Sequence, residues 1–136
     1  MAKKPKPRTG AGTDGLAGRA PRGEVTNHRY PLFSLQHVVA GFSVSNCERD
    51  EKAAFADRLQ QLGQMTWEQI QLGSRQGVGT ETIGRDSICL PIPNHITPEV
   101  RILALRIRQK ARIIGYRQDE VFHIVWIDPK HRVYKG

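Results

Sequence analysis

The last third of the chain carries side chains that could hold a phosphate group and move protons. Arginine binds phosphoryl oxygens through parallel N–H donors, histidine titrates near neutral pH, and tyrosine can donate a proton or stack on a base. The candidates of these types are Arg106, Arg108, Arg112, Arg117, His123, His131 and Tyr134. We expect the arginines to bind phosphate or RNA, and His131, Tyr134 and His123 to serve proton transfer or positioning.

Cleavage of RNA without a metal ion would need these groups in one place. A base removes the proton of the 2′-hydroxyl, an acid protonates the leaving 5′-oxygen, and arginines hold the phosphate in line. Each proton-transfer group contributes on the order of 10²–10⁴ in rate. The same residues also fit a surface that binds without cutting, because most single histidines in strands are hydrogen-bonded structural residues and strand arginines often form a solvated face.

A metal site built from His123, Asp128 and His131 is a weaker interpretation. Side chains alternate across a strand, and this alternation would place His123 and Asp128 on opposite faces. The glycines between residues 73 and 84 match neither a phosphate-binding loop nor a dinucleotide-binding fingerprint. We therefore expect no metal and no cofactor.

Three strands are predicted to position the candidate residues, at 101–108, 112–116 and 121–127, with a short last segment at 131–134. In the first strand the odd positions Leu103, Leu105 and Ile107 are apolar and the even positions include Arg106 and Arg108, so one face should meet the helices while the other carries guanidinium groups. The third strand is almost wholly apolar and ends at Asp128-Pro129, because proline cannot donate to the ladder.

Two capping boxes predict a helical hairpin before the sheet. Residues 45–48 (Ser-Asn-Cys-Glu) should start the first helix, with its apolar stripe at Phe55, Leu59 and Leu62 and a left-handed glycine stop at Gly63. Residues 66–69 (Thr-Trp-Glu-Gln) should start the second helix, with Trp67 in the core. The predicted class is α+β: a short helical hairpin packed on a small antiparallel sheet.

The remaining segments are predicted from composition. Residues 1–29 are basic and poor in apolar bulk, so we expect a disordered tail, and residues 30–136 should form one domain. Residues 30–44 favour either a strand or a helical turn. Residues 73–99 are rich in glycine and proline and indicate a connector, with a short strand at 87–90. Cys47 and Cys89 are in no metal-binding spacing and should be buried thiols.

The net charge of +8 is concentrated at the two ends of the chain. Residues 1–30 carry seven Lys/Arg and two acids, and residues 95–136 carry nine and four. This distribution predicts a polyanionic partner, RNA or DNA rather than a membrane. The sequence contains no apolar run of membrane-spanning length and no secretory h-region, so we expect a cytoplasmic protein.

The layout of hairpin, basic strand and terminal His/Tyr segment resembles the RelE/ParE-like toxins of bacterial toxin–antitoxin systems. Residues 111–127, ARIIGYRQDEVFHIVWI, are similar to the central hairpin of that family, and residues 131–134, HRVY, look like its terminal segment. The likeness covers about residues 48–134. It implies that Arg112 binds phosphate, that His131 and Tyr134 transfer protons or stack on a base, and that a cognate antitoxin protein covers the basic face.

We therefore expect a RelE-like protein that binds RNA, on or off the ribosome, and cleaves it without metal as an endoribonuclease. Two alternatives from other classes stay open. One is a non-catalytic nucleic-acid- or protein-binding module of phage or mobile-element origin. The other is a gyrase-type protein inhibitor, because the ParE-like branch of the family acts on gyrase and fold alone does not fix function.

Overall fold

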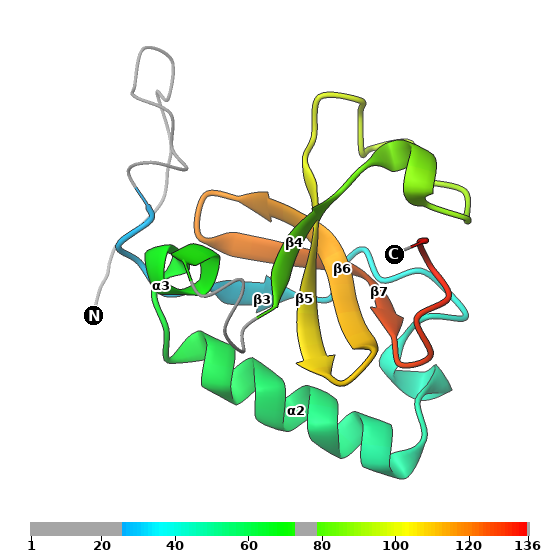
Figure 1. The fold of residues 1–136 in the computed structure, drawn as a ribbon, viewed down its shortest axis with the longest axis horizontal. Helices are drawn as coiled ribbons and strands as arrows, with labels where there is room; N and C mark the ends of the chain where they lie inside the picture. Colours follow the sequence, from blue (N-terminus) through cyan, green and yellow to red (C-terminus); the bar gives the residue numbers. More distant parts are fainter. Residues whose placement is uncertain (1–25, 73–78, 136) are drawn as a thin grey trace.

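The computed structural model describes residues 26–72 and 79–135, which form a five-stranded sheet with helices against one face (Figure 1). The strand order is β3-β7-β6-β5-β4; β3 pairs with β7 in parallel and the other pairs are antiparallel. The class is α+β, as predicted. The strands are β3 (Leu32–Ser34), β4 (Thr80–Ile83), β5 (Ile102–Arg108), β6 (Ala111–Gln118) and β7 (Val121–Asp128). The helices are α2 (Arg49–Gly63) and α3 (Trp67–Leu72), with 3₁₀ turns η1 (Val44–Asn46) and η2 (Arg85–Ser87).

The helix-facing side of the sheet follows the predicted alternation. Leu103 and Leu105 of β5 are buried in one apolar cluster with Leu62 of α2 and Trp67 of α3, and Ile107 packs against it. Trp67 is fully buried, so its predicted place in the core is confirmed. Its indole Nε1–H donates to the backbone oxygen of Glu120 at 2.9 Å, so its polar atom is satisfied.

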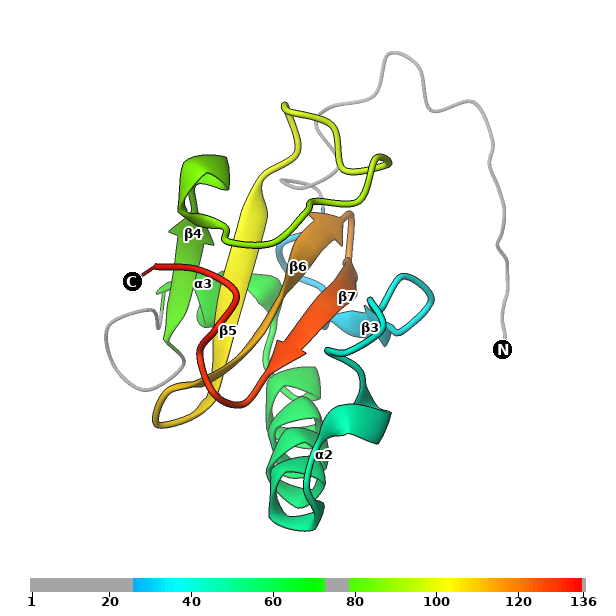
Figure 2. The ribbon, with the colours of Figure 1, turned by 90° about the vertical axis from the view of Figure 1, so that its right-hand side faces the viewer.

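The other side of the sheet is not the open basic face that we predicted. Ile102, Ala104 and Ile114 on this side are buried in a second apolar cluster. It is covered by the segment between η2 and β5 and by the C-terminal segment, which contribute Ile96 and Val133. Figure 2 shows the C-terminal segment in front of the sheet and α3 behind it. Apolar Ile102 and Ala104 were the local signal that this face of β5 is buried, whereas the residues that cover it come from distant loops.

A bulge in β7 overturns the predicted separation of His123 and Asp128. Ile114 pairs with Trp126 but Gly115 pairs with Ile124, so Val125 is an extra residue in β7. The extra residue reverses the alternation, and His123 and Asp128 therefore share one face. They still lie apart, because they pair with Tyr116 and Arg112, which are about 13 Å from each other along β6 at the usual rise per residue.

The ends of the helices differ partly from the prediction. Helix α2 starts three residues later than expected: Glu48 is its N-cap, and the Glu51 carboxylate accepts from the Glu48 N–H at 2.8 Å. Gly63 is the last residue of α2, but it does not adopt the predicted left-handed conformation. Among the described glycines, Gly41 and Gly79 have a positive φ. The second capping box is confirmed, since the Thr66 N–H donates to Gln69 Oε1 at 2.9 Å and the Gln69 N–H to Thr66 Oγ1 at 3.2 Å.

The segments before α2 and after α3 are more structured than predicted. Residues 30–44 contain β3, which settles the strand-or-turn alternative. The prediction of a strand at residues 87–90 is wrong. The strand in this part of the chain is β4, and Ile88 makes only an isolated bridge with Tyr134. Most of the tail prediction, residues 1–25, and the connector residues 73–78 lie outside the described residues. Cys47 is buried as predicted, whereas Cys89 is exposed. Among the helices of the described ranges, none has the length and apolar character of a membrane span.

Candidate functional site

A polar cluster lies where β4 and the C-terminal segment meet. The Tyr134 hydroxyl donates to Glu81 Oε1 at 3.0 Å, and the His131 and Tyr134 rings lie 4.5 Å apart between centroids. Arg112 of β6 lies near the same hydroxyl, where its positive charge lowers the pKa of Tyr134. Three of the residues predicted from the sequence therefore converge, Arg112, His131 and Tyr134. Together with Glu81 we call them the tyrosine cluster.

The C-terminal segment is held in place by backbone contacts. The buried Asp128 carboxylate accepts from the backbone N–H groups of Arg132, at 2.8 and 2.9 Å, and of Val133, at 2.9 Å. The backbone N–H of Cys89 donates to the Val133 carbonyl at 2.7 Å. His131 adopts a left-handed φ of 57°, which lets the chain turn back over the sheet end. These contacts aim Tyr134 at β4.

The guanidinium of Arg112 is oriented by two backbone carbonyls. Its Nη1 donates to Gln109 O at 2.6 Å and to Ala111 O at 3.1 Å. Arg106 is its cross-strand neighbour and is exposed, with its side chain lying over Gly79, where an added Cβ would come within 2.8 Å of the Arg106 Cβ. The two arginines thus sit side by side at one end of the sheet, where they could share a phosphate.

The environment of Tyr134 keeps its hydroxyl protonated. Burial raises the pKa of Tyr134, and the Glu81 carboxylate beside it raises this pKa further, while Arg112 lowers it. Only 4% of the Tyr134 surface is exposed, so the hydroxyl is a shielded donor. In this setting Glu81 is the group that could accept a proton, and the Tyr134 hydroxyl orients its carboxylate.

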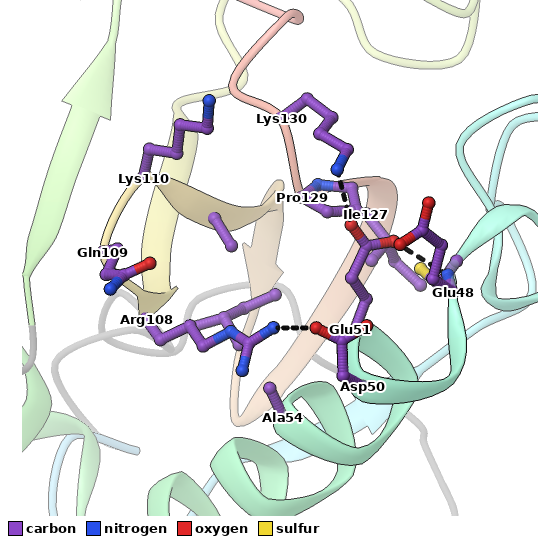
Figure 3. Close-up of a pocket in the computed structure, with 13 residues that line it drawn as sticks. Glu48, Asp50, Glu51, Ala54, Arg108, Gln109, Lys110, Ile127, Pro129 and Lys130 are labelled. Carbon is purple, nitrogen blue, oxygen red and sulfur yellow. Dashed lines mark hydrogen bonds and ion pairs between the residues drawn. The ribbon is translucent and has the colours of Figure 1, made fainter.

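Arg108 lies in a different place, on the rim of a cavity of about 170 Å³ between the start of α2 and the β5–β6 turn (Figure 3). Its Nη2 contacts Asp50 Oδ2 at 2.9 Å, and this hydrogen bond lowers the pKa of Asp50. Lys130 Nζ pairs with Glu51 Oε2 at 3.1 Å on the same rim. The predicted phosphate contact Arg108 is therefore paired with a carboxylate of α2.

Arg117 and His123 also lie away from the tyrosine cluster. The guanidinium of Arg117 is on the helix side of the sheet, 4.4 Å from the Trp67 ring centroid, and its Nη2 donates to Thr26 Oγ1 at 3.0 Å. His123 stacks on Tyr116 at 4.9 Å, at the opposite end of β6 from Arg112. The structure thus groups some of the predicted residues and separates others.

Glu81 was not predicted, because its strand lies inside a segment whose glycines and prolines indicated a connector. The available signal was weak: Thr80, Thr82 and Ile83 are β-branched residues, which favour strands, but the four residues do not alternate between polar and apolar. Three histidines also gather unexpectedly: His37 lies 4.3 Å from His95 and 5.5 Å from His123 between ring centroids. Within residues 26–72 and 79–135, no three His, Cys, Asp or Glu side chains are placed to hold a metal ion.

The histidine group makes stability depend on pH. Burial lowers the pKa of His123, and the neighbouring His37 and His95 lower it further. The unfolded chain then binds more protons than the folded one, so the free energy of unfolding should fall as pH drops below about 6.5, the ordinary histidine pKa. Thermal melts from pH 8 to pH 5 should show this fall, and His123→Asn should flatten it. The same replacement at the exposed His28 serves as control; an equal slope in the wild type and His123→Asn would contradict the expectation.

Comparison with known proteins gives one structural resemblance. No family model and no curated protein matches the chain. The fold is similar to the crystal structure of an archaeal RelE–RelB complex from Pyrococcus horikoshii, with 14% sequence identity and a TM-score of 0.43. The match covers 76% of this chain and 97% of that one. A likeness of this extent carries no information about the site.

Proposed function

We propose that the chain binds RNA and cleaves it at the tyrosine cluster without using a metal ion. The observation that carries this proposal is the contact of the Tyr134 hydroxyl with Glu81, beside Arg112 and His131. These residues supply a proton acceptor, a phosphate-binding cation and two groups that can donate protons. Exposed Arg106 and Arg132 lie at the same end of the sheet and add positive charge for the RNA backbone.

The reaction is a transesterification within one nucleotide. The 2′-oxygen attacks phosphorus while Glu81 takes the 2′-hydroxyl proton, and the bond from phosphorus to the 5′-oxygen breaks. His131 donates a proton to that oxygen, and Tyr134 orients Glu81 through its hydroxyl. Arg112 neutralises the charge that builds on the phosphoryl oxygens. The products are a 2′,3′-cyclic phosphate and a free 5′-hydroxyl, so protons and charge balance.

Incubation of purified protein with single-stranded RNA and excess EDTA, with and without ribosomes, tests this proposal. We expect cleavage to 2′,3′-cyclic phosphate ends. Arg112→Ala should slow single-turnover cleavage roughly 10- to 150-fold, as loss of a charged hydrogen bond to phosphate implies. The exposed Arg49→Ala on α2 is the matched control and should have little effect. Absence of cleavage under all conditions would refute the enzymatic part.

Binding without cleavage is the second candidate, and the burial of Tyr134 favours it. Only 4% of Tyr134 is exposed, so it can stack on a base or pass a proton to a substrate only if the C-terminal segment moves. In that case Arg106, Arg112 and Arg132 would form a cationic surface for RNA or for an acidic segment of a cognate antitoxin. Binding would then weaken steeply with salt and with Arg→Ala changes, and it would not respond to His131→Ala. A supercoiling assay separates both candidates from a gyrase-type inhibitor.

A further inference from the structure

A cavity of about 550 Å³ opens at the end of the sheet opposite to Arg112. It lies where β5 starts and β6 ends, and none of the residues assigned to the tyrosine cluster lines it. Its volume is within the roughly 300–1,000 Å³ that small-molecule sites occupy. The residues that matter for its chemistry are His95, Glu99, Arg101, Tyr116 and Gln118.

Two of the lining residues are aromatic and belong to a larger ring assembly. The centroids of His95 and Tyr116 are 5.6 Å apart, and Tyr116 stacks on His123 at 4.9 Å with planes inclined by 21°. His37 lies 4.3 Å from His95 and 5.5 Å from His123 between ring centroids, so the four rings contact one another in a closed group. A planar ligand could extend such an assembly, because nucleobases bind proteins by stacking on tyrosine and histidine rings.

The polar lining residues complement the edge of a base. Gln118 Oε1 lies 3.1 Å from His123 Nε2. If His123 donates there, the carboxamide of Gln118 is oriented and its NH₂ group remains to donate to a ring nitrogen or carbonyl. Glu99 can accept from an exocyclic amino group, and the Thr97 hydroxyl that hydrogen-bonds to it lowers its pKa, which favours the ionised form. Exposed Arg101 offers a cation for a phosphate.

We propose that this cavity binds one unstacked nucleobase that carries an amino group, stacked against Tyr116 and His95 and with its phosphate toward Arg101. The inference rests on the proposed function in one respect: the base belongs to the RNA whose phosphate reaches Arg112. Tyr116 and Arg112 are about 13 Å apart along β6, a distance that a short single-stranded segment can span. The cavity would thus select the base near the cleaved bond.

NMR of the His95 and Tyr116 ring signals tests the proposal independently of cleavage. Titration with AMP and CMP should shift these signals at lower concentration than UMP, which has no amino group. Short adenine- and uracil-only oligoribonucleotides form the second arm, because they separate a base within RNA from a free nucleotide. Tyr116→Leu should weaken binding of AMP roughly 5- to 150-fold. The exposed Gln118→Ala should reduce the difference between CMP and UMP without unfolding the protein.

Tyr30→Leu is the matched control, because Tyr30 is exposed and does not line the cavity, so its replacement should leave binding unchanged. Ribose 5-phosphate is the control ligand: if it shifts the ring signals as effectively as AMP, the cavity binds an anion and the proposal fails. It also fails if neither nucleotides nor oligonucleotides shift them. Nucleotide binding without RNA cleavage would support the base-binding cavity and refute the proposed nuclease activity. Cleavage without any base preference would support the nuclease activity and refute the base-binding cavity.

Discussion

Replacement of Glu81 by glutamine is expected to lower the rate of RNA cleavage by about 10²–10⁴-fold, the contribution of a general base. Glutamine keeps the size of the side chain and an oxygen that can accept from the Tyr134 hydroxyl, now 3.0 Å from Glu81 Oε1. It removes the negative charge that takes up the 2′-hydroxyl proton. The loss should therefore appear in the single-turnover rate, whereas RNA affinity, followed by fluorescence anisotropy, should stay nearly the same.

The partner variant Tyr134→Phe makes this prediction sharper. If Glu81 and Tyr134 act as a unit, the double variant should be little worse than the poorer single variant, because effects of coupled catalytic residues do not add. The exposed Glu68→Gln on α3 is the control for loss of one carboxylate. Unchanged cleavage in Glu81→Gln would show that Glu81 is not the general base and serves only to fix Tyr134, so the proposed mechanism would fail although cleavage itself remained.

Local patterns predicted the central part of the fold well. The alternation in 101–108, the turn at 109–110 and the stop at Asp128-Pro129 correspond to β5, the β5–β6 turn and the end of β7. Period and turn chemistry are local properties, so neighbouring residues are enough to indicate them. Strand β4 escaped prediction, since its pairing of Thr82 with Leu103 connects residues that are far apart in sequence.

The candidate site was predictable as a set of residue types and only partly as an arrangement. The sequence singled out Arg112 and Tyr134 but left open whether they meet, and their roles remain predictions. Glu81 joins them through the long-range pairing of β4 with β5, and His123 is placed by the extra residue Val125 in β7. Neither the pairing of β4 with β5 nor the extra residue in β7 has a signature in the local sequence. The ion pair of Arg108 with Asp50 likewise depends on where α2 docks.

Gly115→Ala is expected to destabilise the fold by about 3 kcal/mol or more, at the upper end of what overpacking costs. A Cβ at this buried position would lie 1.9 Å from the His123 carbonyl oxygen and 3.2 Å from the Ile124 Cα. These are backbone atoms of the neighbouring strand, so no side-chain rotation relieves the clash and β6 and β7 must separate. The bulge of β7 lies next to this close approach. At the bulge, the Val125 carbonyl accepts a hydrogen bond from the Val39 N–H at 2.9 Å.

Urea denaturation followed by circular dichroism measures this cost, and Gly63→Ala provides the matched control. Gly63 ends α2 without a left-handed conformation, and a Cβ there has no heavy atom within 4 Å. Alanine should therefore be neutral or stabilise by up to about 1 kcal/mol, its advantage over glycine in a helix. Backbone entropy favours alanine over glycine at both positions. A lower urea midpoint for Gly115→Ala, but not for Gly63→Ala, would therefore show that the fold requires the close approach of β6 and β7. Equal midpoints would mean that β7 shifts at little cost, and the placement of His123 beside Tyr116 would then not depend on Gly115.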